Sequence, residues 1–391
     1  MKTKKRTLYF FGNLSSIKIH FLEIIPFLIL FLFFSSCDVN NIEDTPLPPL
    51  PEDAAVYLSM DGTEAGLWIL NANTLELTDS MITAPGVPWY IEFSLDNTIW
   101  YSSWGRGSDY KLYSLTLKPM SVNHSISLKN ASSSLAYNKN QDYLIAYNNK
   151  GIEIFERTSL NLVKCDTSTL FGESSRITPS SLDNKIYFTW IENRQIVGLG
   201  KYDLTSLKVI DTLRLFNDAQ FYGLQDVDLT ISNDDKYLFF SAFNWRGLSG
   251  FGSFFVIDLT QRTILKEYRV GAFSQMAISP DGKNVFISDP GGYLYNFPSS
   301  GKIWQYNVEN KTMNVLLNDL YYTDRITVAE DNRTLFITPV ISFSMKDGQR
   351  AWVVKVDAQN GKIKSYYPVF YDSTGYYTNN PRNIRMGQYI K

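Results

Sequence analysis

The chain has 391 residues, of which 15% are aromatic and only 19% are charged, with 37 Lys and Arg against 39 Asp and Glu. A chain that is acidic on balance lacks the basic surface that nucleic-acid binding requires, so no nucleic-acid partner is expected. Its two histidines and two cysteines exclude a multi-histidine metal centre and a cysteine-rich zinc or iron–sulfur site. There is also no dense run of Asp and Asn of the kind that forms calcium loops, and we expect neither a metal nor a cofactor.

The first 36 residues have the pattern of a secretion signal. Four basic residues lie between Lys2 and Arg6, and residues 24–34 form an apolar core of 11 residues. That core is too short to cross a bilayer as a helix, which takes about 20 residues. Removal of residues 1–36 leaves 32 basic and 38 acidic residues, so the exported chain is more acidic than the whole.

The signal ends at a cysteine, Cys37, which directly follows Ser35 and Ser36. This arrangement resembles the lipobox of bacterial lipoproteins, in which the signal is cut before the cysteine and its sulfur carries a diacylglycerol. Phe34 stands where those proteins usually have leucine, and looser motifs of this kind are common in the Bacteroidetes. The resemblance implies a membrane anchor through lipid on Cys37, with the cell envelope, and within it the outer membrane, as the location. The alternative is an ordinary signal peptide or signal anchor with an incidental cysteine.

Residues 37–53, which include the lipidated cysteine, are acidic and rich in proline, and show no apolar periodicity. Proline-rich segments stay extended, so we interpret this stretch as a tether that holds a globular domain, residues 54–391, away from the membrane. With Cys37 lipidated, Cys165 has no cysteine left with which to form an intramolecular disulfide.

From residue 54 onward, short predicted strands alternate with turn signals. The clearest copy of the repeat, at residues 276–288, reads strand, Ser-Pro-Asp-Gly turn, strand, and fainter copies occur at 229–240 and 326–337. Asp, Asn and Gly recur in the turns because tight hairpins need residues that tolerate a left-handed backbone. Repeats of about 40–50 residues with several short strands each are typical of a β-propeller.

The repeats add up to seven blades. Six complete blades lie between about residues 86 and 370, and residues 54–83 hold three strands of a seventh that lacks its innermost strand. Residues 381–390 supply a strand of that kind. We therefore predict an all-β, seven-bladed β-propeller whose last blade is closed by N- and C-terminal strands together, which pairs two strand edges that would otherwise be open.

One copy of the repeat carries a family resemblance. Residues 279–283 read Ser-Pro-Asp-Gly-Lys, and Ile257 and Asp258 end a third strand. This pattern resembles the YVTN-type seven-bladed propellers of bacterial surface and periplasmic proteins, although the sequence Tyr-Val-Thr-Asn does not itself occur. The resemblance covers most of residues 54–391 and implies the fold; because such propellers include binding proteins and lactonases, it leaves the function open.

In a propeller, the first strand of each blade lines a central channel. Counting ten residues back from the start of each second strand selects one comparable position per blade. The channel candidates are Trp89, Ser134, Arg176, Asp228, Gln275, Arg325 and, from the C-terminal strand, Arg382. Arginine side chains suit carboxylate or phosphate ligands because the guanidinium can donate two parallel hydrogen bonds. The alternative is that these residues pair with one another or with backbone carbonyls and fill the channel.

A second set of candidates lies in the long connections between second and third strands, where tryptophan and tyrosine occur beside polar residues. These mouth-loop candidates are Trp104, Arg106, Trp190, Asn244, Trp245, Arg246 and Tyr293. Aromatic side chains with a few polar groups suit sugar platforms and protein interfaces alike. The alternative is that the aromatic side chains fold over the blade edges and shield the core.

Three classes of function fit these features. We favour a lipid-anchored binding module that holds a protein, peptide or glycan partner without catalysis. The second is a lactonase-like or lyase-like hydrolase in the channel, for which Asp228 and Glu192 are the possible bases. The third is an accessory subunit of an envelope assembly that is contacted on its blade sides. His124 is expected on an outermost strand, remote from the channel, and carries no catalytic role in this interpretation.

Overall fold

The computed structural model describes most of the chain from residue 46 onward. The described residues are 46–62, 66–82, 87–93, 98–104, 110–117, 120–129, 132–148, 151–167, 176–192, 195–216, 224–244, 251–290, 301–318, 320, 323–339, 343–344, 350–368 and 379–388. The signal, Cys37 and most of the predicted tether lie outside them. The propeller belongs to a compact unit that begins at Leu47.

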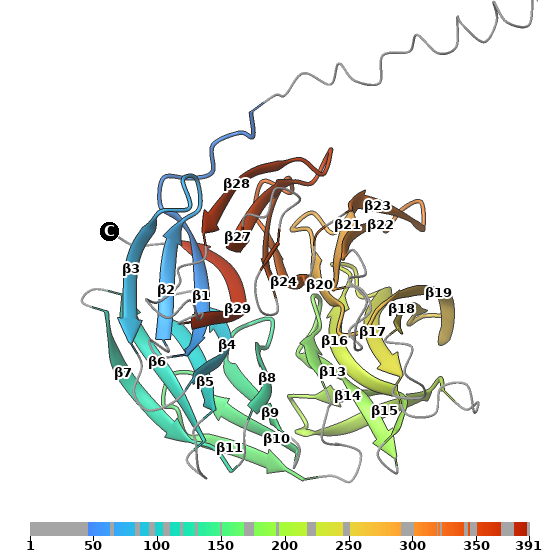
Figure 1. The fold of residues 1–391 in the computed structure, drawn as a ribbon. Coiled ribbons are helices and arrows are strands. Elements are labelled where there is room, and N and C mark those ends of the chain that lie inside the picture. Colours follow the sequence, from blue (N-terminus) through green and yellow to red (C-terminus); the bar gives the residue numbers. More distant parts are fainter. Residues whose placement is uncertain are drawn as a thin grey trace, which may run out of the picture. The chain divides into compact units, whose positions relative to one another are not determined.

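The predicted fold is confirmed: seven antiparallel sheets surround a central channel, with one strand of each sheet innermost (Figure 1). Each sheet is one blade, with its strands ordered from the channel outward.

Blade 1 is β4 (Val87–Phe93), β5 (Ile99–Trp104), β6 (Lys111–Leu117) and β7 (Met120–Ser127). Blade 2 is β8 (Ser132–Tyr137), β9 (Tyr143–Asn148), β10 (Gly151–Glu156) and β11 (Leu162–Asp166). Blade 3 is β12 (Ile177–Pro179), β13 (Lys185–Glu192), β14 (Gln195–Asp203) and β15 (Lys208–Arg214). Blade 4 is β16 (Leu224–Ile231), β17 (Tyr237–Asn244), β18 (Phe251–Asp258) and β19 (Thr263–Gly271).

The remaining blades include one irregular sheet. Blade 5 is β20 (Gln275–Ile278), β21 (Asn284–Asp289), β22 (Lys302–Asn307) and β23 (Thr312–Leu317). Blade 6 is β24 (Thr323–Val328), β25 (Thr334–Pro339), β27 (Arg350–Asp357) and β28 (Ile363–Pro368), with a two-residue strand, β26 (Phe343–Ser344), beside β27. Blade 7 is β29 (Asn379–Gln388), β1 (Ala54–Gly62), β2 (Gly66–Asn71) and β3 (Leu77–Ile82).

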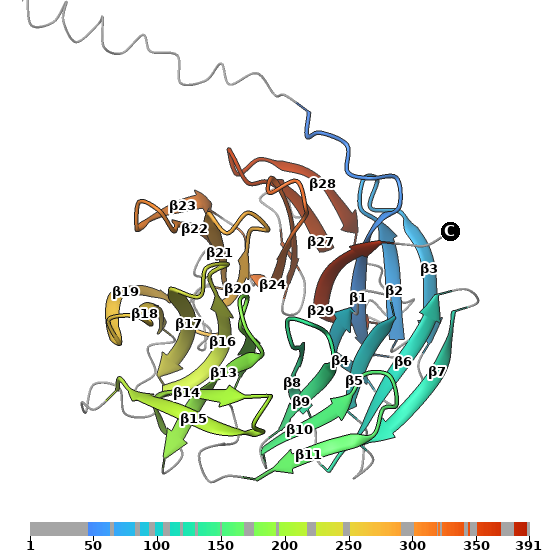
Figure 2. The ribbon, with the colours of Figure 1, turned by 180° about the vertical axis from the view of Figure 1, so that it is seen from behind.

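Blade 7 joins the two ends of the domain, as the sequence predicts. The C-terminal strand β29 pairs antiparallel with β1, from Ala54 opposite Gln388 to Gly62 opposite Asn379. Figures 1 and 2 show β29 on the channel side of β1, so the last strand of the chain becomes the innermost strand of the blade that begins the domain. The ring of blades is thereby closed by hydrogen bonds between its two ends.

The hydrophobic core lies between the blades. Seven clusters of buried residues each join two neighbouring blades, one cluster for every blade interface among the described residues. The two neighbouring residues Phe239 and Phe240 of β17 are both fully buried, but Phe239 packs toward blade 5 and Phe240 toward blade 3. Successive side chains of a strand point to opposite faces, and here both faces are covered, which explains why the second strands read as continuous apolar runs.

The hairpins between first and second strands hold neighbouring blades together at one end of the channel. Asp235, in the hairpin of blade 4, accepts a hydrogen bond from the backbone N–H of Ser181 in blade 3, at 2.8 Å. The Oδ1 atom of Asn332 in blade 6 accepts one from the N–H of Asp281 in blade 5, also at 2.8 Å. The Asp and Asn residues that the sequence marks as turn formers therefore also link the blades.

The end of the predicted tether is part of the domain. Leu50 is buried in the cluster between blades 6 and 7. Its backbone N–H donates to Asn73 Oδ1 at 2.9 Å, and Asn73 Nδ2 donates back to the Leu50 carbonyl at 3.1 Å. The segment that starts the domain thus begins before residue 54.

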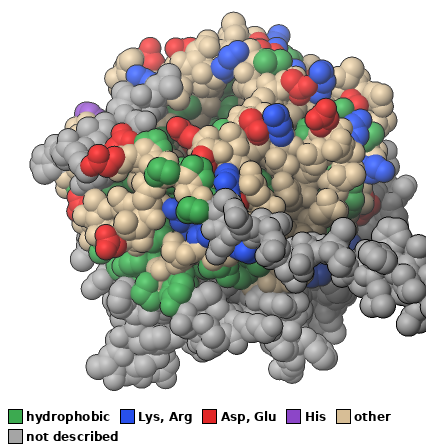
Figure 3. All heavy atoms as spheres, turned by 90° about the horizontal axis from the view of Figure 1, so that it is seen from above, with side chains coloured by type: hydrophobic (Ala, Val, Ile, Leu, Met, Phe, Trp, Pro, Cys, Tyr) green, Lys and Arg blue, Asp and Glu red, His purple; other side chains and the backbone are tan. Residues whose placement is uncertain are grey.

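The side of the domain in Figure 3 carries acidic and basic side chains interspersed, without a field of one sign. That pattern matches the low net charge of the chain and offers phosphate backbones no continuous basic track on this side. No helix in the described part of the chain is long and apolar enough to cross a membrane.

Candidate functional site

A cavity of about 420 Å³ lies where the inner strands of the blades meet. Five of the seven channel candidates are in its wall, namely Ser134, Arg176, Asp228, Gln275 and Arg325. They come from blades 2 to 6, so the cavity is built by residues that are far apart in the chain. The side chains of the other two candidates, Trp89 and Arg382, lie outside the described residues.

The wall has two rings of residues that follow from strand geometry. Side chains two positions apart on a strand share a face, so an inner strand can contribute one residue to each ring. Among the described residues, the first ring consists of Tyr90, Ser134, Arg176, Asp228, Gln275 and Arg325. The second ring, nearer the hairpin turns, consists of Glu92, Ala136, Thr178, Thr230, Ala277, Thr327 and Arg385. The first ring is polar and aromatic, and the second combines small side chains with one acidic and one basic residue.

In blade 1, Tyr90 lines the cavity at the position equivalent to the channel candidates of blades 2 to 6. Residues on either side of the hairpin pair as Phe93 with Ile99, a separation of six, whereas the corresponding separation in blade 4 is seven, from Ile231 to Leu238. The hairpin of blade 1 is therefore one residue shorter. Counting ten residues back from the start of β5 consequently passes the position equivalent to Asp228 of blade 4 by one residue. Trp89 lies at an irregularity of β4, and its side chain is outside the described residues.

In blade 7, the described side chain of Arg385 lines the cavity. The register of β29 on β1 shifts between Asn383, opposite Ser59, and Pro381, opposite Met60, so Arg382 has no partner on β1. Such a bulge is typical where proline interrupts the ladder. The second strand of this blade is at the other end of the chain, so the count used for the other blades could not be made for this one.

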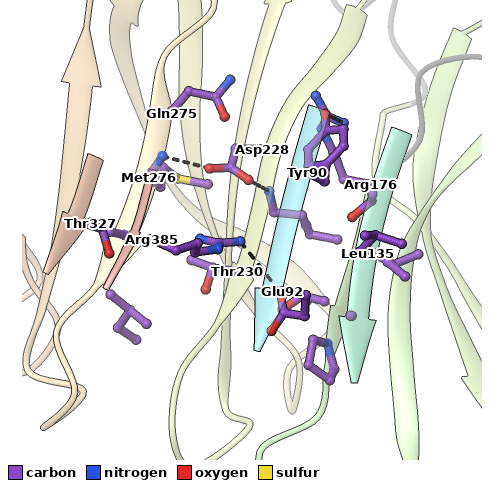
Figure 4. A pocket seen from close by; sticks show the side chains of 18 of the residues that line it. Tyr90, Glu92, Leu135, Arg176, Asp228, Thr230, Gln275, Met276, Thr327 and Arg385 are labelled. Carbon is purple, nitrogen blue, oxygen red and sulfur yellow. Dashed lines mark hydrogen bonds and ion pairs between the residues drawn. The ribbon is translucent and has the colours of Figure 1, made fainter. Parts of the chain in front are cut away.

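Two arginines from opposite parts of the ring converge on Tyr90. The Nη1 atom of Arg176 donates a hydrogen bond to the Tyr90 hydroxyl group. The guanidinium carbon of Arg176 lies 5.2 Å from the centre of the Tyr90 ring, and that of Arg325 lies 5.8 Å from it. Both distances are within the range of cation–π attraction. Figure 4 shows Tyr90 and Arg176 side by side in the channel.

Arg325 is fixed by its neighbours. Its Nη1 atom donates to Gln275 Oε1 at 2.6 Å, and its Nε atom lies 3.8 Å from Asp324 Oδ1. Burial would lower the pKa of the guanidinium, but the carboxylates of Asp324 and Asp228 and the phenol of Tyr90 raise it above its usual value. The cavity therefore holds a permanent positive charge at this position.

Asp228 is satisfied by the backbone. Its Oδ2 atom accepts the N–H of Met276 in blade 5 at 2.8 Å, and its Oδ1 atom accepts the N–H of Leu229 at 3.0 Å (Figure 4). The carboxylate thus links blade 4 to blade 5 as well as facing the cavity. A carboxylate held in this way serves the structure of the channel wall.

Glu92 and Arg385 form the charged pair of the second ring. Arg385 Nη2 lies 3.9 Å from Glu92 Oε2, and Arg385 Nε donates to the Ile91 carbonyl at 3.4 Å (Figure 4). Burial raises the pKa of the Glu92 carboxyl, and the charge of Arg385 and the N–H of Phe93 offset only part of that effect. A titratable carboxyl with a raised pKa in a cavity is a feature that sequence reasoning missed.

Buried hydroxyl groups behind the first ring hold the inner strands in place. Ser241 Oγ donates to the Ser274 carbonyl at 2.6 Å, and Thr189 Oγ1 accepts the N–H of Arg176 at 3.1 Å. Thr338 Oγ1 accepts the N–H of Arg325 at 3.3 Å. These buried hydroxyl groups could have been found from the sequence. In these blades a serine or threonine follows the first-ring residue by 13 positions, as Thr189 follows Arg176.

Of the mouth-loop candidates, only Trp190 has a described side chain. It packs against the cluster between blades 2 and 3, with the guanidinium carbon of Arg214 4.8 Å from its ring centre. Arg214 in turn pairs with Glu192 at 2.6 Å. Trp104 and Asn244 end β5 and β17, but their side chains are outside the described residues, as are Arg106, Trp245, Arg246 and Tyr293 entirely.

Other titratable residues singled out in the sequence lie away from the cavity. His124 lies on the outermost strand β7, where its backbone N–H donates to Ser114 Oγ at 3.1 Å. Asp258 accepts the N–H groups of Thr260 and Gln261 at 2.9 and 2.8 Å and so caps a turn. Within the described residues, no three His, Cys, Asp or Glu side chains are grouped so that they could hold a metal ion.

Comparison with known proteins identifies the fold and no family. No family model and no curated protein matches the chain. A Bacteroides uniformis structure provisionally assigned as a 6-phosphogluconolactonase is 14% identical, with a TM-score of 0.61 over 86% of this chain and 100% of that one. Hydrazine synthase of Kuenenia stuttgartiensis is 12% identical, with a TM-score of 0.55 over 78% of this chain and 96% of that one. A Desulfotomaculum acetoxidans protein of unknown function is 13% identical, with a TM-score of 0.55 over 80% and 99%. Identities this low show a shared propeller fold and nothing of activity.

Proposed function

We propose that this propeller is a non-catalytic binding module of the bacterial cell envelope, which holds a polar group of a protein, peptide or glycan partner in its central cavity. The observation that carries the proposal is the convergence of Arg176 and Arg325 on Tyr90 within a cavity of about 420 Å³. Cavities of this size with a few convergent polar groups are typical of ligand sites. The blades fix these groups rigidly, as recognition requires.

Binding is favoured over hydrolysis by the state of the cavity carboxylates. A general base must be able to approach the proton that it removes. Asp228 accepts two backbone N–H groups, and Glu92 lies beside Arg385. Glu192, the other base considered from the sequence, pairs with Arg214 away from the cavity lining. These contacts suit a rigid wall better than a proton-transfer site.

The proposed location rests on the sequence. Residues 1–36 have the pattern of a secretion signal, and Ser35, Ser36 and Cys37 resemble a lipobox. The YVTN-type repeat resemblance also suits a protein of the bacterial surface or periplasm. Growth with radiolabelled palmitate should label the wild-type chain in the outer-membrane fraction, and Cys37→Ser should abolish that label. An unlabelled wild-type chain would rule out the lipid anchor.

The binding role is tested by crosslinking the lipidated protein in its own membranes and identifying what is captured. A stoichiometric partner should be lost in Arg176→Gln and in Arg325→Gln. It should be retained in Arg262→Gln, which removes an exposed arginine that pairs with Asp211 on the blade surface. Retention of the partner in the two cavity variants would instead place the contact on the blade sides, as for an accessory subunit.

A second candidate is lactonase-like or lyase-like hydrolysis, favoured by one observation. Burial raises the pKa of the Glu92 carboxyl in the cavity, and raised carboxyl pKa values are typical of acid–base catalysts. Turnover of a lactone or ester panel by the wild type, lost in Glu92→Gln with ligand affinity unchanged, would establish the enzyme. Absence of turnover across the panel would leave the binding module.

A further inference from the structure

The two arginines of the first ring share one neutral acceptor. Arg176 comes from blade 3 and Arg325 from blade 6, yet both side chains reach the phenol of Tyr90 in blade 1. Like charges are brought together in this way only where the surroundings compensate them. The phenol oxygen carries no charge when protonated, whereas a carboxylate in its place would add an opposite charge and could accept two parallel hydrogen bonds from one guanidinium.

The acidic residues of the cavity do not occupy that position. Both oxygens of Asp228 accept backbone N–H groups, and Glu92 lies beside Arg385 in the second ring. The described lining therefore contains three arginines and two acidic residues. Counted over these lining residues, the charge is positive by one when both acids are ionised, and Asp324, 3.8 Å from Arg325 behind the lining, offsets part of the charge of Arg325.

The rest of the lining suits a ligand with many hydroxyl groups. The side chains of Ser134, Thr178, Thr230, Gln275 and Thr327 all line the cavity. Hydroxyl and amide groups can donate and accept, so each can satisfy a sugar hydroxyl in either orientation.

We propose that the cavity binds the carboxylate of an acidic sugar, a hexuronic acid or the terminal residue of a uronic-acid glycan, between Arg176 and Arg325. The carboxylate replaces the Tyr90 hydroxyl group as the acceptor of the Arg176 hydrogen bond, while the Tyr90 ring stays packed between blades 1 and 2. This inference rests on the proposed binding function and names the class of its ligand.

Isothermal titration of the full-length lipidated protein in detergent at pH 7 tests the inference. The probes are D-glucuronate, D-galacturonate, D-mannuronate and L-guluronate, each beside its neutral hexose, together with galactose 6-phosphate. At least one uronate should bind tenfold or more tightly than its neutral hexose. Equal affinity for the acid and the hexose, tighter binding of the sugar phosphate, or no binding of any uronate would each overturn the proposal.

Four cavity variants sharpen the test. Arg176→Gln and Arg325→Gln should each weaken uronate binding at least tenfold, and Arg176→Lys should weaken it less, because it keeps the charge but loses the second hydrogen bond. Tyr90→Phe should increase the affinity, because it removes the hydroxyl group that competes with the carboxylate, and an unchanged affinity would contradict the proposal. If the contacts were purely structural, Tyr90→Phe would weaken binding as the arginine variants do, and that result would contradict the proposal.

A control variant and the membrane experiment separate the possible failures. Arg262→Gln lies outside the cavity and should bind uronate as the wild type does, and every variant must melt as one cooperative transition. A partner captured in membranes and lost in the cavity variants, together with no uronate binding, would overturn the sugar class and leave the binding function standing. Turnover of a bound ligand would overturn the binding function itself.

Discussion

Arg333 and Asp357 form a bidentate ion pair inside blade 6, with Arg333 Nε 3.0 Å from Asp357 Oδ1 and Nη2 2.7 Å from Oδ2. Asp357 is fully buried. Burial would raise its pKa, but the hydrogen bonds from Arg333 and from the N–H of Gln359 hold that pKa below its usual value. Asp357→Asn should lower the free energy of unfolding by roughly 3 kcal/mol, because it leaves a guanidinium without its counter-charge in a largely buried position. Urea denaturation at pH 7 measures the change.

The exposed pair of Arg262 with Asp211 is the matched control. It has the same residue types, with a shortest separation of 2.5 Å, but both side chains are more than two-fifths exposed. Solvent screening reduces such pairs to at most about 1 kcal/mol. Asp211→Asn should therefore change stability much less than Asp357→Asn. Equal losses would show that burial of the blade 6 pair does not determine its contribution.

Glu153 provides a pH test at the residue scale. Its buried carboxylate accepts the N–H of Lys129 at 3.0 Å and the side-chain N–H of Asn148 at 2.8 Å. Burial nevertheless raises its pKa above the usual 4.5. The folded protein therefore binds this proton more tightly than the unfolded chain does. The stability contributed by Glu153 must fall as pH rises from 4.5 to the folded-state pKa.

Glu153→Gln removes this dependence while keeping the shape of the side chain. Unfolding free energies of the variant and the wild type should be similar below pH 4.5. The difference should then shift in favour of the variant as pH rises through the window, because the variant has no buried carboxylate to charge. Denaturation curves between about pH 4 and pH 8 check this. A difference that does not change with pH would show that Glu153 has the same pKa in both states.

At the scale of elements, the turns between third and fourth strands share one backbone conformation in blades 2 to 7. Each of these six turns places a residue with positive φ at the equivalent position. These residues are Leu75, Leu160, Leu207, Arg262, Lys311 and Gly361. Only one of them is glycine, so five turns carry the cost of a left-handed residue with a side chain. Because glycine is mostly absent, the sequence gives little indication of a left-handed residue in these turns. It predicted turns between the strands but not their backbone conformation.

Gly361→Ala should be more destabilising than the conformation alone implies. Gly361 has φ of +70°, and a Cβ atom there would lie 2.0 Å from the backbone oxygen of Leu316 in blade 5. The left-handed backbone costs roughly 1–2 kcal/mol for a residue with a side chain, and the clash adds to it. Lys311→Asn, at the equivalent position with φ of 55°, should be neutral or slightly stabilising because asparagine tolerates this region. Thermal unfolding of both variants tests the contrast, which equal melting shifts would contradict.

At the scale of the whole molecule, the ring depends on β29. This strand pairs with all of β1, and Ile384 is buried in the cluster between blades 6 and 7. Truncation after Thr378 should expose the edge of β1 and one side of the channel, and abolish the single cooperative unfolding transition. Truncation after Gln388, which keeps all of β29, should melt as the full chain does. Calorimetry and limited proteolysis distinguish the two. A single cooperative transition in the chain that ends at Thr378 would show that the ring does not need β29.

Much of this architecture could be predicted because its causes are local. Strand lengths, the Asp, Asn and Gly turns and the repeat period follow from neighbouring residues, and they predicted seven blades with the correct closure of the last. Arg176, Asp228, Gln275 and Arg325 were also placed on the channel by a constant spacing to the second strand. That spacing is local too, since it spans one hairpin.

The sequence by itself determined that the chain is a seven-bladed propeller and which inner strands carry the polar residues, because strand alternation and turn chemistry act over a few residues. Only the tertiary structure decided which side chains meet. A hairpin one residue shorter put Tyr90 at the channel position of blade 1, and the pairing of β29 with β1 brought Arg385 beside Glu92. The contact of Arg176 with Tyr90 joins residues 86 positions apart. Closure of the ring brings such residues together, and no local pattern contains that information.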